Sequence, residues 1–231
     1  MNVFKHFGLV GVGVAAALAV SVPVFADGSD GAQIRQYEVR VTNITRGQQF
    51  TPLLTVVHNT RLSLFSLGAL ASTALATLAE QGDTSPLTSL LSTSPDVASV
   101  ATQGGLLNPG QTRTFTVSAS GNFDSLTVAA MLIPTNDAFM FVRISDLPRN
   151  GRTVAQYGIA YDAGSERNDE LCSSIPGPFF SECGGPGGGA SVGGGEGFVH
   201  VHAGIHGIGD LKASQRDWRN PVVSVSVRRI G

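Results

Sequence analysis

The fold of this chain is decided by the stretch Leu126-Thr127-Val128-Ala129-Ala130-Met131-Leu132-Ile133. These residues are almost continuously apolar, and the run is far too short to span a membrane. A short apolar run of this kind is typical of a central strand that is buried on both faces. Two more runs of strand length follow, at 138–144 and 153–160, with turn residues between them. The middle of the chain therefore predicts a buried sheet.

Further strands are predicted on both sides of this centre. Tyr37 to Ile44 alternates apolar and polar residues, and Val222 to Ile230 does the same. Such alternation is typical of strands with one face in a core and one in solvent. Shorter runs of strand character lie at 53–58, 112–118 and 198–202. Many short strands with regular turns favour an all-β fold, specifically an antiparallel β-sandwich.

One segment between the early strands has a helical period instead. Within residues 64–91, apolar residues recur at helical spacing from Leu67 to Leu78 and so define one apolar face. Gly82-Asp83 is expected to end this helix, and Ser85-Pro86 to begin a shorter one. The predicted architecture is therefore a β-sandwich with a helical insertion.

The N-terminus has the pattern of a secretory signal peptide, residues 1–26. A short basic start at Lys5 precedes an apolar core from Phe7 to Val22, and Val24-Phe25-Ala26 offers small residues for cleavage. An uncleaved anchor is the alternative. We expect residues 27–36 to be flexible and 37–231 to form one domain. A secreted or periplasmic protein is predicted, without a transmembrane segment after cleavage.

The two cysteines, Cys172 and Cys183, are predicted to pair, because an exported protein matures in an oxidising compartment. By loop entropy this bridge contributes about 2–3 kcal/mol of stability. A cysteine metal site is disfavoured, since the sequence has no second cysteine pair.

Charge and motifs disfavour two classes of function. Lys and Arg total 15 against 17 Asp and Glu, and the basic residues are scattered, so no nucleic acid is expected as a partner. The sequence has neither a Gly-x-Ser-x-Gly nor a His-Glu-x-x-His motif, so we predict no enzyme activity. The glycine-rich residues 184–197 have no core-forming pattern and are predicted to be a flexible loop. A phosphate-binding loop is disfavoured, because no Gly-Lys-Ser/Thr follows them.

An acidic stretch, Tyr161-Asp162-Ala163-Gly164-Ser165-Glu166, follows the strand at 153–160. Two carboxylates bent around a glycine cannot stay buried and charged without a partner. Calcium prefers carboxylate and backbone oxygens on loops of this kind. Asp137 also follows a predicted strand, so neighbouring strands would bring Asp137 and Asp162 to one edge of the sandwich. Alternatively, these aspartates merely cap turns.

Two motifs carry a family resemblance: Met131-Leu132-Ile133-Pro134-Thr135-Asn136-Asp137-Ala138-Phe139, and the later Tyr161-Asp162-Ala163-Gly164-Ser165-Glu166. Together they resemble the spondin N-terminal domain, the F-spondin/mindin domain of animal matrix proteins, which also occurs as a stand-alone bacterial secreted protein. The Tyr37-Glu38-Val39 and Trp218-Arg219-Asn220-Pro221-Val222 strands also fit, so the resemblance covers roughly Tyr37 to Ile230.

The resemblance implies a C2-like β-sandwich that binds one calcium ion at the loops of one end. The family's ligand positions fall on Asp137, Asp162 and Glu166, with Asn168 and Asp169 as possible additional ligands. Two residues depart from the family pattern: Glu166 stands where the family has Asp, and Ala138 replaces an aromatic residue. The implied function is a calcium-binding adhesion module whose partner is an unknown protein or glycan outside the cell.

A histidine cluster offers a different function. His200 and His202 lie two residues apart on a predicted strand, so they face the same side, and His206 follows four residues later. Three imidazoles would suit copper or zinc and would make the protein a secreted metal carrier or metalloenzyme. The alternative is that the rings pack and form hydrogen bonds as structural residues.

Overall fold

The computed structural model describes residues 33–231 except Val192. The predicted signal peptide, residues 1–26, and most of the segment 27–36 lie outside the described residues. Within the described part, no helix is both long and apolar enough to cross a membrane.

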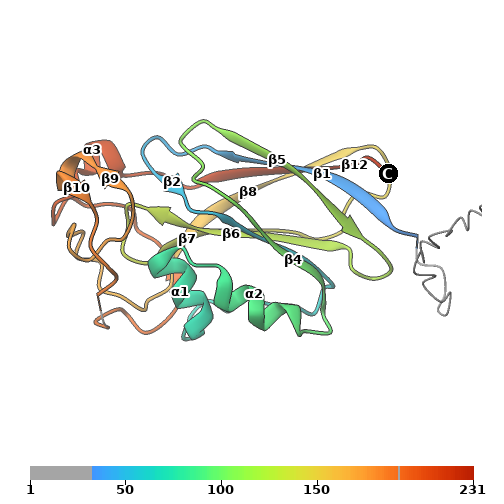
Figure 1. The fold of residues 1–231 in the computed structure, drawn as a ribbon, viewed down its shortest axis with the longest axis horizontal. Coiled ribbons are helices and arrows are strands. Elements are labelled where there is room, and N and C mark those ends of the chain that lie inside the picture. Colours follow the sequence, from blue (N-terminus) through green and yellow to red (C-terminus); the bar gives the residue numbers. More distant parts are fainter. Residues whose placement is uncertain (1–32, 192) are drawn as a thin grey trace, which may run out of the picture. The chain divides into compact units, whose positions relative to one another are not determined.

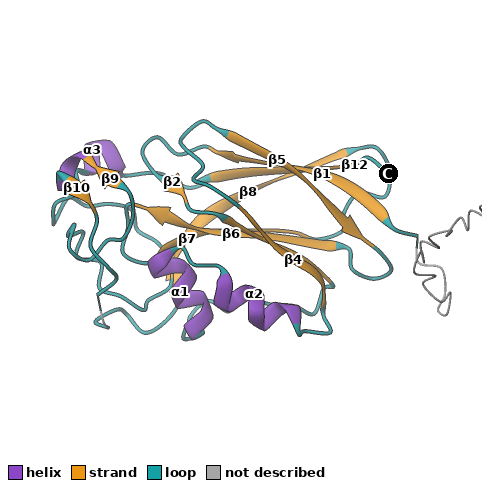
Figure 2. Cartoon of the chain, viewed as in Figure 1, coloured by secondary structure: helices purple, strands orange, loops and turns teal. Residues whose placement is uncertain are grey.

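The described chain is built mainly of antiparallel strands, which confirms the all-β prediction (Figures 1 and 2). The elements, in chain order, are β1 (Arg35–Asn43), β2 (Gln49–Phe50), β3 (Leu53–His58), α1 (Thr73–Gln81), α2 (Ser85–Ser92), β4 (Val97–Gln103), β5 (Thr112–Ala119), β6 (Ser125–Ile133), β7 (Ala138–Ile144), β8 (Thr153–Asp162), β9 (Phe179–Phe180), β10 (Gly185–Pro186), β11 (His200–Val201), α3 (Ala213–Arg216) and β12 (Val223–Arg229). The main sheet runs in the order β4-β3-β6-β7-β8-β12-β1-β5. The helical insertion predicted between early strands is α1 and α2, which lie between β3 and β4.

The long strand β8 connects the two layers of this sheet. Its first half pairs with β12, ending at Gly158 opposite Val223, and its second half pairs with β7 from Ile159 to Asp162. The change of partner occurs at Gly158, where a Cβ atom would lie 2.6 Å from the carbonyl oxygen of Phe141. Glycine therefore allows the strands to approach closely where the sheet folds over on itself. The layers β4-β3-β6-β7 and β12-β1-β5 face one another across the main core.

The strand β6 is buried along its whole length, as its apolar sequence predicts. Val128 and Ala130 belong to the core between the layers. The outer face of this layer is covered by α1 and α2, whose Leu75 and Leu87 pack in a second apolar cluster with Phe139 of β7. A strand between two such layers has no solvent-facing side, which explains its nearly continuous apolar run.

The first helix begins later than its periodicity predicts. It starts at Thr73, where the Ser72 side chain accepts a hydrogen bond from the Leu75 amide, and it ends at Gly82, which adopts a left-handed conformation. Leu67 and Leu70 lie outside the helix and are exposed. The chain before the helix is instead tied to the segment preceding β11, through the bonds Gly68 N to Val199 O and Val199 N to Ala69 O.

Some strands also differ from those predicted, and β11 is limited to His200–Val201 rather than 198–202. The strand β1 begins at Arg35 rather than Tyr37, because Arg35 pairs with Ala119 and its side chain donates to the Gly121 carbonyl. The edge strand β4 was not predicted; its residues are small, and many are exposed. The predicted disulfide between Cys172 and Cys183 is present.

Candidate metal centre

The two predicted aspartates lie together at one end of the sandwich. Asp137 directly precedes β7 and Asp162 is the last residue of β8, where Ala138 and Asp162 are partners in the strand register. The amide of Ala163 donates to the Asp137 carbonyl. Both side chains are buried, with 0% of Asp137 and 1% of Asp162 exposed. The strand ends therefore place two carboxyl groups side by side inside the protein.

Asp137 is only half satisfied by hydrogen bonds. Its Oδ2 accepts from the amides of Ser165 (2.8 Å) and Glu166 (3.0 Å), whereas its buried Oδ1 has no hydrogen-bond partner among the described residues. Burial, reinforced by the charge of Asp162, raises the pKa of Asp137 to about 7. In the described part of the chain, neither aspartate forms an ion pair with a lysine or an arginine. No lysine or arginine of the described chain therefore balances the negative charge of the pair at neutral pH.

Asp162 lies at the centre of the cluster. Its Oδ1 accepts from the Gly164 amide and its Oδ2 from the Asn168 side chain, both at 2.7 Å. The same two oxygens also face two imidazoles: His200 Nε2 is 3.6 Å from Oδ1, and His202 Nε2 is 3.7 Å from Oδ2. The structure therefore brings the acidic motif and the histidine motif, predicted as separate sites, to one residue.

The side chain of Glu166 points to a different set of partners. Its amide binds Asp137, but its Oε1 accepts from the amide and hydroxyl of Ser191 at 2.7 and 2.8 Å. Its Oε2 is buried without a hydrogen-bond partner in the described chain, and burial raises its pKa. Asp169, the other acid considered as a ligand, accepts hydrogen bonds from Asn136 and Ser174 with its two oxygens. In the described part of the chain, the predicted set Asp137, Asp162 and Glu166 therefore does not form one group of close ligand atoms. The charge of Asp162 acts on Asp137, whereas the Glu166 carboxylate is bound by Ser191.

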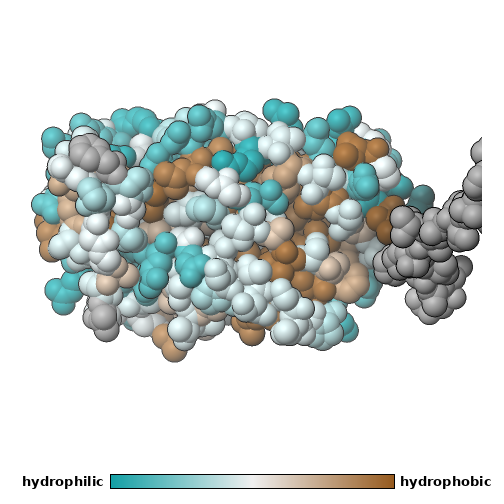
Figure 3. Space-filling model, viewed as in Figure 1, coloured by the Kyte–Doolittle hydropathy of each residue, from teal (hydrophilic) through white to brown (hydrophobic). Residues whose placement is uncertain are grey.

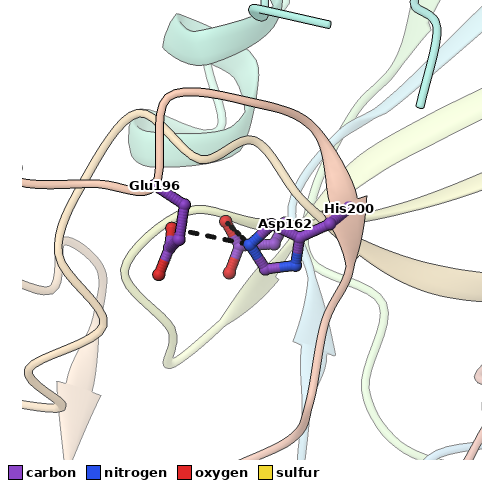
Figure 4. Close-up of side chains that lie close together, drawn as sticks. All are labelled: Asp162, Glu196 and His200. Atoms are coloured by element: carbon purple, nitrogen blue, oxygen red, sulfur yellow. Dashed lines mark ion pairs between the residues drawn. The ribbon is translucent and has the colours of Figure 1, made fainter. Parts of the chain in front are cut away.

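An acid that the sequence analysis did not consider, Glu196, completes the cluster. Asp162, Glu196 and His200 each present one ligand atom, and these three atoms lie within 4.8 Å of one another (Figure 4). Glu196 lies in the glycine-rich residues 184–197, whose lack of a core-forming pattern made it look like a flexible loop.

Some glycines of this segment pack closely against other parts of the chain. A Cβ atom at Gly195 would lie 2.5 Å from the Gly164 carbonyl oxygen, and Gly194 forms a β-bridge with Glu166. The amide of Gly197 also donates to the Gly164 carbonyl. Because these glycines have no side chains, the backbone lies directly on the acidic loop, residues 161–166. This packing places Glu196 beside Asp162.

The three histidines have different surroundings. His202 is buried, packs against Trp218 with ring centroids 5.0 Å apart and planes tilted by 41°, and accepts the Gly204 amide on Nδ1. Burial, reinforced by the charges of His200 and His206, lowers the pKa of His202 to about 4, so this ring is neutral at pH 7. His206 is exposed.

Another unpredicted acid, Glu170, stabilises the turn that carries His206. This buried carboxylate accepts the amides of His206, Gly207 and Ile208 at 2.6–3.0 Å. Three successive amides are a sufficient set of donors for a buried anion, so the Glu170 carboxylate needs no cation as a further partner. We therefore exclude Glu170 from the candidate metal ligands.

The cluster is chemically suited to a divalent cation. Two buried carboxylates repel each other unless a cation or a proton neutralises one of them, and a buried charge without a partner is costly. The unpartnered Oδ1 of Asp137 is the atom such an ion would satisfy. Oxygen donors on two loops match the preference of calcium, so the residues present fit the ion that the family resemblance implies.

The comparisons agree with the motifs read from the sequence. A family model described as Spondin_N matches residues 34–168, which is more than half of the chain and includes Asp137, Asp162 and Glu166. A comparison with curated proteins gave no match. Glu196 and the three histidines lie beyond the matched residues. The family match confirms the predicted resemblance, and the chain belongs to the spondin N-terminal domain family.

Proposed function

We propose that this protein is an extracellular binding module whose loop end is held together by a calcium ion. The observation that carries the proposal is the buried pair Asp137 and Asp162, with Asp137 Oδ1 lacking a hydrogen-bond partner among the described residues. A cation there would neutralise the pair and tie the β6–β7 turn to the loop after β8. Membership of the spondin N-terminal family and the disulfide support an extracellular site of action.

The ligands would come from two segments of the chain. Asp137 and Asp162 supply carboxylate oxygens, and backbone carbonyls of the same loops are the natural source of further ligands. Glu166 holds Ser191 with its Oε1, while its buried Oε2 has no partner among the described residues and could serve as a further ligand. The role of calcium is thus structural: it would fix the loops that present the binding surface.

We do not propose catalysis. The site's carboxylates accept hydrogen bonds from neighbouring backbone and side-chain groups, and Asp162 is wholly buried, so neither aspartate is placed to exchange protons with an outside substrate. The surface drawn in Figure 3 shows small apolar groups separated by hydrophilic ones. A mixed surface of this kind suits a protein or glycan partner bound through scattered contacts.

Calcium is expected to raise the melting temperature of the protein, and Asp162→Asn is expected to abolish that rise. An ion at 100 times its dissociation constant stabilises the folded state by about 2.7 kcal/mol. For a chain of this size that corresponds to a rise of about 5–10 °C. Differential scanning calorimetry of the mature protein, first with chelator and then with calcium, measures the effect.

The control is Asp83→Asn, an exposed carboxylate that accepts a hydrogen bond from the Ser85 amide. This variant should respond to calcium as the wild type does. An identical melting curve with chelator and with calcium would refute the calcium site. A screen on immobilised glycans and matrix proteins tests the binding role separately, and we expect binding that requires calcium and is lost in Asp162→Asn.

A further inference from the structure

We propose that the protein has a second metal site, of zinc type, formed by Asp162 Oδ1, Glu196 Oε2 and His200 Nε2 (Figure 4). The site differs from the calcium site in its donors, because it adds a nitrogen ligand and does not use Asp137. Two of its three ligands come from residues beyond the family match. It also differs from the three-histidine set expected from the sequence, because it replaces His202 and His206 with carboxylates.

The tautomer of His200 makes its Nε2 a metal ligand. Its Nδ1 lies 3.1 Å from the Val201 carbonyl oxygen, which can only accept, so Nδ1 carries the proton of the neutral ring. The lone pair is then on Nε2, which faces two carboxylates and has no hydrogen-bond donor near it in the part of the chain that is described. A lone pair directed at two anions is unfavourable unless a metal ion or a proton lies between them. A backbone carbonyl holding the other nitrogen is the usual orientation for a histidine bound to a metal.

The two distances from His200 are close to those of a small tetrahedral ion. His200 Nε2 lies 3.6 Å from Asp162 Oδ1 and 3.5 Å from Glu196 Oε2. Zinc binds nitrogen and oxygen at 2.0–2.2 Å, so two ligands of a tetrahedral site are about 3.3–3.5 Å apart. Small side-chain adjustments would therefore suffice to bind the ion. One imidazole with two carboxylates suits zinc better than calcium, which prefers oxygen ligands alone.

His202 supports this site without binding the ion. Its Nδ1 accepts the Gly204 amide, so the neutral ring carries its proton on Nε2 and has no lone pair to offer there. That buried N–H has no hydrogen-bond partner in the described region, and the nearest acceptor is Asp162 Oδ2 at 3.7 Å. This group is a second, independent sign that the cluster is incomplete without an ion, since a small shift of Asp162 toward a metal would let His202 donate to it. That hydrogen bond would then hold Asp162 in the orientation that binds the ion.

The site is open to solvent on one side. The side chain of His200 is 28% exposed and that of Glu196 is 40% exposed, whereas that of Asp162 is 1% exposed. An ion would therefore enter past Glu196, because His200 Nε2 and Asp162 are themselves buried. His206 does not join the group of ligand atoms found in the described chain.

Zinc titration of the metal-free mature protein by calorimetry, in a buffer that contains calcium, tests the site. We expect one zinc per chain in the wild type. His200→Ala should weaken zinc binding by at least about 100-fold, because loss of a residue that merely holds a metal ligand in place already costs about 10–100-fold in affinity. His206→Ala is the matched control and should bind zinc as the wild type does. Cobalt in place of zinc should give the visible absorption of a tetrahedral ion, and this signal should vanish in His200→Ala.

Different substitutions should remove calcium binding and zinc binding separately. Asp137→Asn should lose the calcium-induced rise in melting temperature and keep zinc binding, whereas His200→Ala should do the opposite. Asp162 belongs to both sites and is not used here. Equal zinc affinity in the wild type and in His200→Ala would overturn the proposal, and so would an equal loss in His206→Ala. Circular dichroism of each variant verifies that it is folded.

Discussion

With all divalent cations removed at pH 7, Asp137→Asn is expected to be more stable than the wild type. Burial and the charge of Asp162 raise the pKa of Asp137 from an ordinary value of 3.8 to about 7. Ionising Asp137 therefore costs more in the folded protein than in the unfolded chain. A difference of one pKa unit between the folded and unfolded states corresponds to about 1.4 kcal/mol, so ionising Asp137 lowers the free energy of unfolding by about 4 kcal/mol at pH 7. Asparagine keeps an oxygen for the Ser165 and Glu166 amides and places an uncharged group where Oδ1 has no partner.

The sign of the pH dependence follows from the raised pKa. Between pH 4 and 7 the folded protein holds a proton on Asp137 that the unfolded chain has released, so stability falls as the pH rises through this range. Below pH 4 both states are protonated at this group and the contribution is fully present. Urea denaturation of the wild type and of Asp137→Asn at several pH values, in chelator, measures the difference. The gap between the two proteins should favour the variant increasingly as the pH rises.

Asp83→Asn is again the control, because the pKa of Asp83 is shifted in the opposite direction to that of Asp137. The Ser85 side chain and amide donate to Asp83 and lower the pKa of its carboxyl group. Its ionised form is therefore favoured in the folded state, so this variant should gain nothing at pH 7. A chelated Asp137→Asn protein that is less stable than the wild type at pH 7 would show that the carboxylate pair is not strained. Such a result would remove the main reason for placing a cation there.

Without an ion, Asp137 and Asp162 repel each other inside the protein. In the proposed calcium site, binding of the ion would relieve this repulsion, so the stability lost in the empty protein would contribute to the affinity for calcium. A variant that is more stable when empty but no longer responds to calcium would separate these two effects. The spondin fold supplies the strand ends that hold the carboxylates together at this cost.

Most strands were predictable because their burial follows simple rules. The strand β6 is covered on both sides and is apolar throughout, while β1 and β12 alternate because they have one core face. The edge strand β4 was missed because it is paired on one side and consists mainly of small, partly exposed residues. The helix start at Thr73 was also missed, because Leu67 continues the helical period although its chain segment bonds to the β11 region.

The candidate site was predictable only where it follows from strand ends. Asp137 and Asp162 terminate neighbouring strands, so their meeting follows from the topology. Glu196 gave no local signal, since it lies among glycines and reaches the site through backbone packing on Gly164. The difference between His200 and His202 also cannot be read from spacing. Both face Asp162, but Nδ1 of His200 donates to a backbone carbonyl, whereas Nδ1 of His202 accepts a backbone amide.

Gly164→Ala is expected to disrupt the metal centre and to lower the free energy of unfolding by about 2–5 kcal/mol. Gly164 has a φ angle of 64°, in the left-handed region, which costs about 1–2 kcal/mol for a residue with a Cβ atom. That Cβ atom would also collide with the Phe198 carbonyl, and overpacking of this kind adds about 1–3 kcal/mol. Relief of the clash requires the segment that carries Glu196 and His200 to move away from the acidic loop.

The matched control, Gly110→Ala, separates backbone strain from the close approach. Gly110 has a similar φ angle of 74°, but a Cβ atom there would meet nothing within 4 Å. This variant should lose about 1–2 kcal/mol and bind calcium and zinc normally. Chemical denaturation and zinc calorimetry on both variants measure the two effects. Equal stability losses, or unchanged zinc binding in Gly164→Ala, would mean that contact between the glycine-rich segment and the acidic loop does not assemble the site. A larger loss of stability and of zinc binding in Gly164→Ala than in Gly110→Ala would identify the contact of Gly164 with Phe198 as the feature that brings ligands from distant parts of the sequence to Asp162.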